Sequence, residues 1–217
     1  MNDFFIFFIY SVIFFSIMLF SEFLYKKLHI EDEWSRKFAH FTSGLIALSY
    51  PVFIDNHWIV LALTISYILT LFISKKLGFF KSIFNVRRPT YGDLLFVFSS
   101  WWLFFTYQNT QFRIFFFLPF SIVVFSDTFA ALFGKYFPLK KLYFFGCQKS
   151  IGGSFVFFMT TLIINFYFLE GFLQIENCHL YVLLSTMILT LVEALSVRGW
   201  DNFTVPVVSA LLIYIMY

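Results

Sequence analysis

The chain has 217 residues, of which 60% are hydrophobic and only 12% are charged, and its formal net charge at pH 7 is +3. This composition excludes a soluble globular domain and is typical of a polytopic membrane protein, so we expect one integral-membrane domain over residues 1–217. We interpret the basic residues as orienting the chain in a bilayer and as meeting anionic lipid or substrate, and we expect no nucleic-acid partner.

Hydropathy predicts eight apolar spans joined by short loops, so the expected fold class is an all-α, polytopic transmembrane helical bundle. A helix needs about 20 residues at ~1.5 Å each to cross a hydrocarbon core of ~30 Å. The predicted spans are 4–24, 38–54, 57–74, 93–107, 112–133, 151–169, 179–197 and 203–217. Two of them, 93–107 and 203–217, are short for that core. We expect these two to thin the bilayer or to continue as irregular backbone that lines a cavity.

The basic residues divide unevenly between the connections that join these spans. Of the 15 Lys and Arg residues, all except Arg113 fall in the odd-numbered connections. Cationic loops are retained in the cytoplasm, so we expect the odd connections inside and both termini on the non-cytoplasmic side. Because the motifs described below gather in the same connections, we expect the functional site at the cytoplasmic face.

Basic side chains gather at the start of the second span. Arg36 and His40 are four residues apart and Lys37 and His40 are three apart, so the helical period places them along one side. Such a set can hold phosphate groups or exchange a proton. A second basic segment, Arg88-Pro89-Thr90-Tyr91-Gly92, precedes the fourth span. Taken alone, either segment is better explained by anchoring at the membrane surface.

Asp127 lies near the inner end of the fifth span. Residues 127, 130, 131 and 134 share one helical face, which reads Asp, Ala, Ala, Gly, and Lys135 follows. Small residues let another backbone or a phosphate group approach closely. An ionisable residue inside a span costs at least about 2.5–3.5 kcal/mol and is a functional candidate by default. The alternative is a buried structural ion pair beside a helix-packing strip.

The segment 146–154 leads into the sixth span. Gly152 and Gly153 let backbone N–H groups converge on an anion at the positive end of a helix. Lys149 adds a positive charge, and Ser150 adds a hydroxyl for phosphate or a hydrated cation. The order of Gly, Lys and Ser is not that of a Walker loop. A flexible loop with a topology-determining lysine explains the segment about equally well.

The seventh span ends in a second candidate segment. Glu193 and Ser196 share a helical face, and the turn that follows brings Asp201 and Asn202 to the same region. Carboxylate and carboxamide oxygens suit Mg²⁺, which prefers hard oxygen ligands. The alternative is an Asx turn that caps the eighth span, with Glu193 paired to a lysine.

In this order, the motifs resemble those of the phytol kinase, dolichol kinase and CTP-dependent diacylglycerol kinase family of membrane lipid kinases. The resemblance covers about residues 31–206. Its matching pieces are Glu33…Arg36-Lys37…His40, Arg88-Pro89-Thr90-Tyr91-Gly92, Ser126-Asp127-Thr128…Ala131…Gly134-Lys135, Lys149-Ser150…Gly153-Ser154 and Glu193…Ser196…Gly199…Asp201-Asn202…Pro206. The chain departs from the family at Gly152, where a Glu is frequent, and at Val197, where a Pro is common.

The resemblance implies transfer of the γ-phosphoryl group of CTP to the hydroxyl of a lipid alcohol: a prenol, a polyprenol or diacylglycerol. It implies that four residues are catalytic: Asp127, Lys149, His40 and Glu193. Those implied to bind nucleotide or phosphate are Arg36, Lys37, Arg88, Thr90, Tyr91, Gly92, Lys135, Ser150, Gly152, Gly153 and Asn202. Mg²⁺ would be the cofactor, with Asp127, Asp201 and Glu193 as its ligands.

Two other functions fit parts of the pattern. A CDP-lipid-forming cytidylyltransferase shares the Asp-x-x-Ala and Lys-x-x-x-Gly region, although the chain has no His-Gly-Gly segment. A small non-enzymatic transporter or flippase would want ionisable residues near the middle of the membrane and paired broken helices. No residue distinguishes one lipid alcohol from another, or one oligomeric state from another.

Overall fold

A computed structural model describes residues 2–80, 90–144, 147–174 and 178–216. Helices account for most of these residues, as the sequence predicts. The helices are α1 (Asp3–Lys27), α2 (Asp32–Ala47), α3 (Tyr50–Phe53), α4 (His57–Leu77), α6 (Gly92–Thr110), α7 (Ile114–Ser121), α8 (Thr128–Tyr136), α9 (Ile151–Phe166), α10 (His179–Leu195) and α11 (Asp201–Met216). Two π-helical segments, η1 (Ile122–Asp127) and η2 (Tyr167–Phe172), continue α7 and α9. The all-α fold class is therefore confirmed.

Local sequence signals account for several helix boundaries. The Asn56 side chain caps α4 by accepting a hydrogen bond of 3.0 Å from the Trp58 N–H, and α4 ends at Gly78 in the left-handed conformation. Ser150 caps α9 by accepting from the Gly153 N–H at 3.0 Å. A short antiparallel hairpin that the sequence did not predict, β1 (Lys141–Phe144) and β2 (Cys147–Ser150), leads into that cap.

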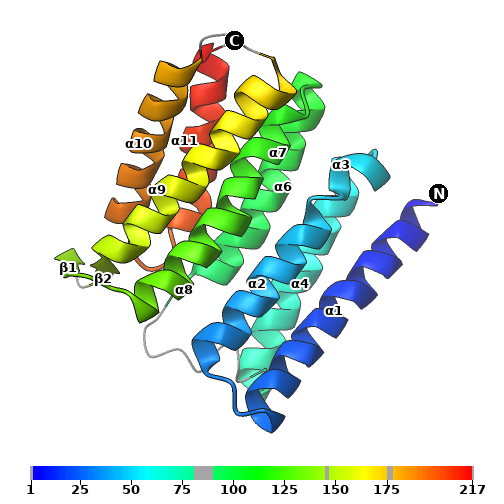
Figure 1. The fold of residues 1–217 in the computed structure, drawn as a ribbon. Coiled ribbons are helices and arrows are strands. Elements are labelled where there is room, and N and C mark those ends of the chain that lie inside the picture. Colours follow the sequence, from blue (N-terminus) through cyan, green and yellow to red (C-terminus); the bar gives the residue numbers. More distant parts are fainter. Residues whose placement is uncertain (1, 81–89, 145–146, 175–177, 217) are drawn as a thin grey trace.

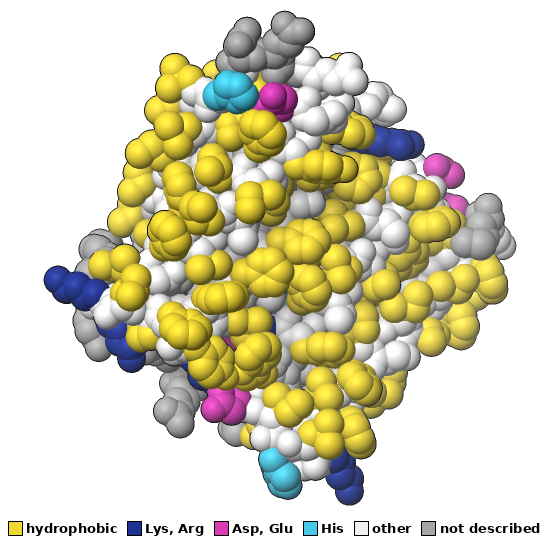
Figure 2. Space-filling view, in the orientation of Figure 1, with side chains coloured by type: hydrophobic (Ala, Val, Ile, Leu, Met, Phe, Trp, Pro, Cys, Tyr) yellow, Lys and Arg dark blue, Asp and Glu magenta, His cyan; other side chains and the backbone are white. Residues whose placement is uncertain are grey.

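The helices run between two ends of one bundle (Figure 1). Both chain termini lie at the end that carries α3. The hairpin, the start of α2 and the turn between α10 and α11 lie at the opposite end, which we call the motif end. The face shown in Figure 2 is mostly hydrophobic. This arrangement places most of the sequence motifs at one end of an apolar bundle.

Four of the described helical rods are long and apolar enough to cross a membrane: Asp3–Lys27, His57–Ser74, Ile114–Tyr136 and Ile151–Phe172. The helices α10 and α11 are apolar but shorter. The fourth predicted span, 93–107, is longer than expected, because α6 has 19 residues and reaches roughly 28 Å at about 1.5 Å per residue. A helix covers the core of each predicted range, but the crossing of the membrane by all eight ranges stays a prediction.

The rod Ile114–Tyr136 occupies the centre of the bundle. Of its most apolar window, 72% is buried, against 22–33% for the other three candidate spans. Its segments α7, η1 and α8 pack against α2, α6, α9 and α11. Pro119 removes one backbone donor inside α7, and the wider π-turns of η1 follow and end at Asp127. The candidate carboxylate therefore sits on the most buried helix, at a change of helical register.

Candidate functional site

Asp127 forms a buried ion pair with Lys37 of α2. The Lys37 ammonium lies 2.5 Å from Asp127 Oδ2, and the two side chains are only 7% and 15% exposed. His40 stands one turn further along α2, with its Nε2 atom 3.7 Å from the same carboxylate oxygen. The imidazole also hydrogen-bonds to the backbone of Val123 in η1, while Nε2 has no hydrogen-bond partner. The predicted association of Lys37, His40 and Asp127 is therefore present.

Arg36 points to a different neighbour from Lys37. Its guanidinium lies 2.9 Å from Glu33 and 3.8 Å from Asp93 at the start of α6. Burial opposes ionisation of Glu33, but Arg36 and Lys37 outweigh it and hold the pKa of that carboxyl below its ordinary value. Burial likewise opposes the charge on Arg36, but Asp93 and Glu33 outweigh it and raise the pKa of the guanidinium. Both groups are therefore ionised near neutral pH.

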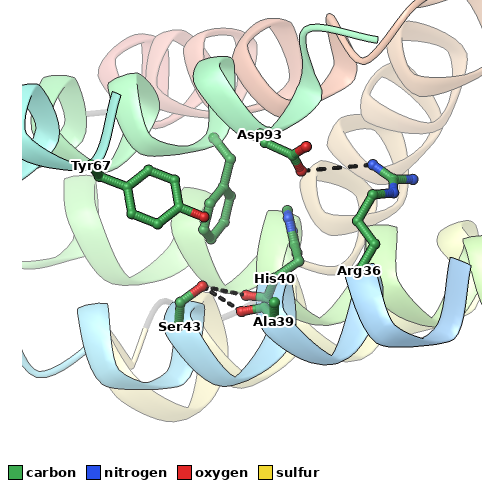
Figure 3. Close-up of a pocket in the computed structure, with 7 residues that line it drawn as sticks. Arg36, Ala39, His40, Ser43, Tyr67 and Asp93 are labelled. Atoms are coloured by element: carbon green, nitrogen blue, oxygen red, sulfur yellow. Dashed lines mark hydrogen bonds and ion pairs between the residues drawn. The ribbon is translucent and has the colours of Figure 1, made fainter. Parts of the chain in front are cut away.

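A cavity of about 10 Å³ lies between α2, α4 and α6, beside these charges (Figure 3). Its polar lining comes from Arg36, His40, Ser43, Tyr67 and Asp93. The Ser43 hydroxyl donates to the Ala39 carbonyl at 2.6 Å, whereas Arg36 Nε and His40 Nε2 are buried without partners. The volume suits about one water molecule.

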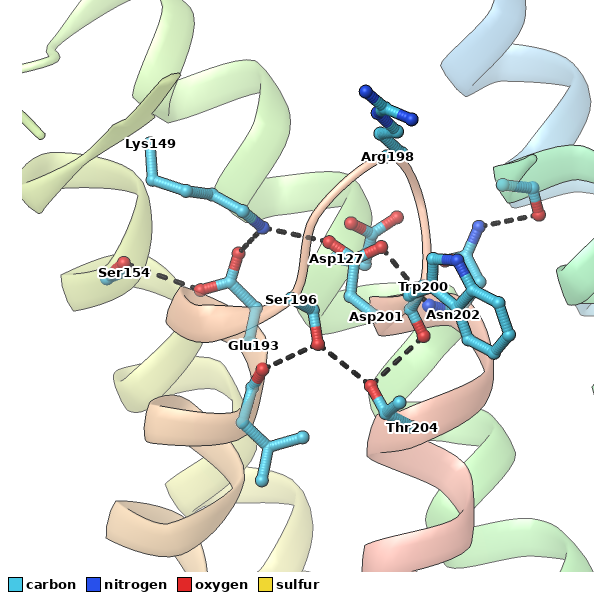
Figure 4. Close-up of polar contacts among 12 residues, drawn as sticks. Asp127, Lys149, Ser154, Glu193, Ser196, Arg198, Trp200, Asp201, Asn202 and Thr204 are labelled. Carbon is cyan, nitrogen blue, oxygen red and sulfur yellow. Dashed lines mark hydrogen bonds and ion pairs between the residues drawn. The ribbon is translucent and has the colours of Figure 1, made fainter. Parts of the chain in front are cut away.

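A second charged cluster joins β2 to the last two helices (Figure 4). The Lys149 ammonium donates to a Glu193 oxygen of α10 and, at 2.8 Å, to Asp201 Oδ2 of α11. Burial alone would lower the pKa of Lys149, but Asp201 and Glu193 outweigh it and raise that pKa. Asp127 also interacts electrostatically with Lys149. The two clusters are therefore coupled through Asp127, as the sequence pattern suggests.

The small residues of α8 pack against the start of α9. A Cβ atom at Gly134 would lie 2.6 Å from the Ser150 hydroxyl, and one at Gly153 would lie 2.9 Å from the Ala130 carbonyl oxygen. At Gly152 a Cβ atom would lie 1.9 Å from the Phe137 carbonyl oxygen. The Glu that the resembling family often has at this position does not fit this backbone. The structure thus gives the small-residue strip a helix-packing role, and phosphate binding by Ser150, Gly152 and Gly153 stays a prediction.

The segment before α6 docks onto the turn before α11. Gly199 has φ +85°, and a Cβ atom there would lie 2.5 Å from the Gly92 backbone, so this close approach requires glycine. The Tyr91 N–H and the Thr90 hydroxyl donate to the Arg198 carbonyl at 2.9 and 3.2 Å.

Asn202, the next residue of this interface, also faces α6. Its Nδ2 donates to the Gly92 carbonyl at 2.8 Å, so it points away from Lys149, while its Oδ1 is buried without a partner. Thr90, Gly92 and Asn202 thus hold two connections together, and their predicted contact with nucleotide is untested.

Two predicted phosphate-binding residues are not brought to these clusters. Lys135 is exposed at the end of α8, where it pairs with Glu31 near the start of α2. The neighbouring Tyr136 hydroxyl accepts from the Trp34 indole, so this pair of contacts joins α8 to α2 at the surface. Arg88 lies outside the described residues.

The donor chemistry of the site fits Mg²⁺, although the predicted ligands are not gathered into one set. Asp127, Glu193 and Asp201 supply the hard carboxylate oxygens that Mg²⁺ prefers. Among the described residues, however, no three His, Cys, Asp or Glu side chains converge closely enough to hold a metal ion. Lys149 instead occupies the place between Glu193 and Asp201. A site with one or two of these carboxylates, completed by nucleotide phosphates, remains compatible with this geometry.

Sequence reasoning missed Asp93 and Tyr67. Asp93 lies in the first turn of α6, where an acidic residue is expected simply because it favours the helix dipole. Tyr67 lies among the apolar residues of α4 and carries no pattern of its own. The available signal for Asp93 was the rule that identified Asp127: an ionisable residue in an apolar span is a functional candidate.

No family model, curated protein or solved structure matches the chain. The resemblance carried by the motifs therefore stays a hypothesis. The functional argument depends on the side chains that the fold brings together.

Removing Lys149 should destabilise the protein, because Glu193 and Asp201 would be left as neighbouring buried carboxylates. We expect Lys149→Met to lower the free energy of unfolding by about 3 kcal/mol. Thermal unfolding of the purified protein in detergent measures this as a melting temperature lower by several degrees. The matched control is Lys141→Met, which removes an exposed lysine from the same hairpin. Equal melting temperatures for the two variants would contradict a buried ion-pair cluster.

Proposed function

We propose that the protein is a membrane lipid-alcohol kinase that transfers the γ-phosphoryl group of CTP to the hydroxyl of a prenol, polyprenol or diacylglycerol. The observation that carries the proposal is the coupling of two buried clusters at the motif end. One joins Lys37 and His40 to Asp127, and the other joins Lys149 to Glu193 and Asp201. Their residues come from segments far apart in the sequence.

Phosphoryl transfer matches this collection of charges. The reaction needs alignment and neutralisation of phosphate charge more than covalent help from the protein. Lys37 and Lys149 supply positive charges at a shielded position, where charge–charge interactions are stronger than in water. Asp127, Glu193 and Asp201 outnumber these lysines, so a divalent cation would offset the excess negative charge. When bound, Mg²⁺ would neutralise the phosphate oxygens, and these carboxylates are the candidates to hold it.

The proposed reaction has a simple atom balance. The lipid hydroxyl oxygen forms a bond to the γ-phosphorus, the bond from that phosphorus to the β–γ bridging oxygen breaks, and CDP leaves. The hydroxyl proton passes to a carboxylate or to His40. Lys37 and Lys149 interact with the charge that develops on the phosphoryl and leaving oxygens. Asp127 orients the hydroxyl, because its carboxylate lies between Lys37 and His40.

We further propose that the protein is multi-pass, with the motif end in the cytoplasm. The support is the concentration of basic residues in the odd-numbered connections and the presence of both chain termini at the opposite end (Figure 1). The lipid bilayer then surrounds the apolar flanks and presents the hydroxyl of a lipid alcohol near the boundary with water.

Cysteine labelling tests this orientation. In a background with Cys147 and Cys178 replaced, the exposed residues Asn109 and Lys140 are changed one at a time to cysteine. In intact cells, a membrane-impermeant thiol reagent should label Asn109→Cys and not Lys140→Cys, because the two positions lie at opposite ends of the bundle. Permeabilised cells, in which both should react, provide the control. The reverse pattern would place the site on the other side of the membrane.

The function is tested with purified protein in nanodiscs, γ-labelled CTP or ATP, and a panel of lipid alcohols. We expect label to pass from CTP to the lipid, and CTP to support faster turnover than ATP. Asp127→Asn should lower the rate by at least about a hundredfold, because losing a transition-state charge contact costs about 3 kcal/mol or more. The matched control is Asp32→Asn at the start of α2, which should keep the wild-type rate.

The contrary outcomes are distinct. Asp127→Asn leaves Lys37 without its charged partner, so the melting temperature is recorded and rates are measured below it. A folded variant that keeps more than about a tenth of the wild-type rate would remove Asp127 from the mechanism. Release of pyrophosphate with cytidine joined to the lipid would identify a cytidylyltransferase instead. No reaction with any lipid alcohol would leave the kinase proposal without support.

A further inference from the structure

An apolar groove of about 330 Å³ lies between α1 and α2. Its lining residues are Val12, Ile13, Ser16, Ile17 and Phe20 of α1, and Phe38 and Thr42 of α2. Protein interiors are close-packed and leave few voids larger than a water molecule. A space of several hundred Å³ is in the size range of small-molecule sites. The groove is therefore too large to be an ordinary packing defect.

Contacts at both ends hold the two helices at a fixed separation. Toward the motif end, the buried Ser21 hydroxyl donates to the Ser35 carbonyl at 2.8 Å. At the other end, the hydroxyls of Tyr10 and Ser49 lie 2.6 Å apart, and the rings of Tyr10 and Tyr50 pack edge to face. Because α1 is tied to the neighbouring chain above and below the groove, the groove does not close by a simple approach of the helices.

The lining offers a guest no free hydrogen-bond donor. The Ser16 hydroxyl donates to the Val12 carbonyl at 2.8 Å, and the Thr42 hydroxyl donates to the Phe38 carbonyl at 2.7 Å. Each hydroxyl is thus satisfied within its own helix, and every other lining side chain is a hydrocarbon or an aromatic ring. A peptide or a lipid headgroup would lose hydrogen bonds in such a groove. A hydrocarbon chain would not.

The groove lies at the same depth in the bundle as the candidate site. Phe38 lines it, and the preceding residue, Lys37, reaches Asp127. At the edge of the bundle, α1 exposes large apolar residues that include Phe15 and Leu19. A lipid can therefore reach the groove from the bilayer and place its polar end near Asp127.

We propose that this groove binds the hydrocarbon chain of the lipid alcohol, an inference that rests on the proposed kinase function. The groove is bounded by one face of each of two helices, so it accommodates one chain that lies along them. This geometry favours an alcohol with a single chain, such as a prenol, over diacylglycerol, whose second chain would remain in the bilayer.

Photocrosslinking tests occupancy without depending on turnover. A single-chain alcohol with a diazirine in mid-chain is added at trace level to the wild-type protein in phosphatidylcholine nanodiscs, and the labelled peptides are mapped. We expect label within residues 12–20 and 38–42, with displacement by excess unlabelled single-chain alcohol and not by excess diacylglycerol. Labelling that extra phosphatidylcholine displaces equally well would mean that ordinary bilayer lipid fills the groove, and the proposal would fail.

A matched pair of variants tests the groove itself. Val12→Trp fills it, whereas Leu19→Trp adds the same side chain on α1 outside it, and the two native residues are similarly exposed, at 48% and 50%. Val12→Trp should reduce groove labelling at least tenfold, and Leu19→Trp should leave it unchanged. In the kinase assay, Val12→Trp should raise KM for a long-chain alcohol about tenfold and leave KM for CTP unaltered.

The two proposals fail in different ways. Specific labelling of the groove without phosphate transfer would retain the groove and remove the kinase. Transfer to lipid alcohols, with equal labelling and equal KM in the two Trp variants, would retain the kinase and remove the groove.

Discussion

The ion pair between Lys37 and Asp127 is the contact on which the candidate site depends. Both side chains are almost fully shielded from solvent, so either charge without the other would be costly. The pair joins α2 to the central rod at η1. Asp127 also interacts with Lys149, whose other partners come from α10 and α11. One buried carboxylate thereby connects the N-terminal helices to the C-terminal ones at the motif end of the bundle.

Such clusters are poor devices for stability, because desolvation offsets much of the attraction between buried charges. Their value lies in the partners that they can exchange. In the proposed reaction, phosphate oxygens take over the interactions of Lys37 and Lys149, and a cation takes over those of the carboxylates. Asp127 is well placed for this exchange, since it follows the wide turns of η1 and faces both lysines. The apolar groove beside Phe38 would bring the lipid to the same depth.

Local patterns predicted the helices well, because apolar runs and cap residues such as Asn56 and Ser150 act over a few residues. They also identified Asp127, Lys149 and Glu193 as a group. The pairing of Lys37 with Asp127 could not be derived in this way, since the two residues are 90 positions apart and meet only when α2 packs on η1. The same limit applies to Asp93 and to the close approach of Gly92 and Gly199. Their partners belong to distant segments, so a single sequence gives each of them an adequate local explanation.

The most direct test separates the chemistry of the Lys37–Asp127 pair from its contribution to folding. A double variant, Lys37→Met with Asp127→Leu, replaces the pair by apolar side chains and leaves no buried charge unpaired. Such replacements are often neutral or stabilising. We expect the melting temperature of this variant to equal or exceed that of the wild type, and its transfer of phosphate from CTP to a lipid alcohol to be undetectable. A double variant that folds and keeps the wild-type rate of transfer would contradict the placement of the reaction at this pair.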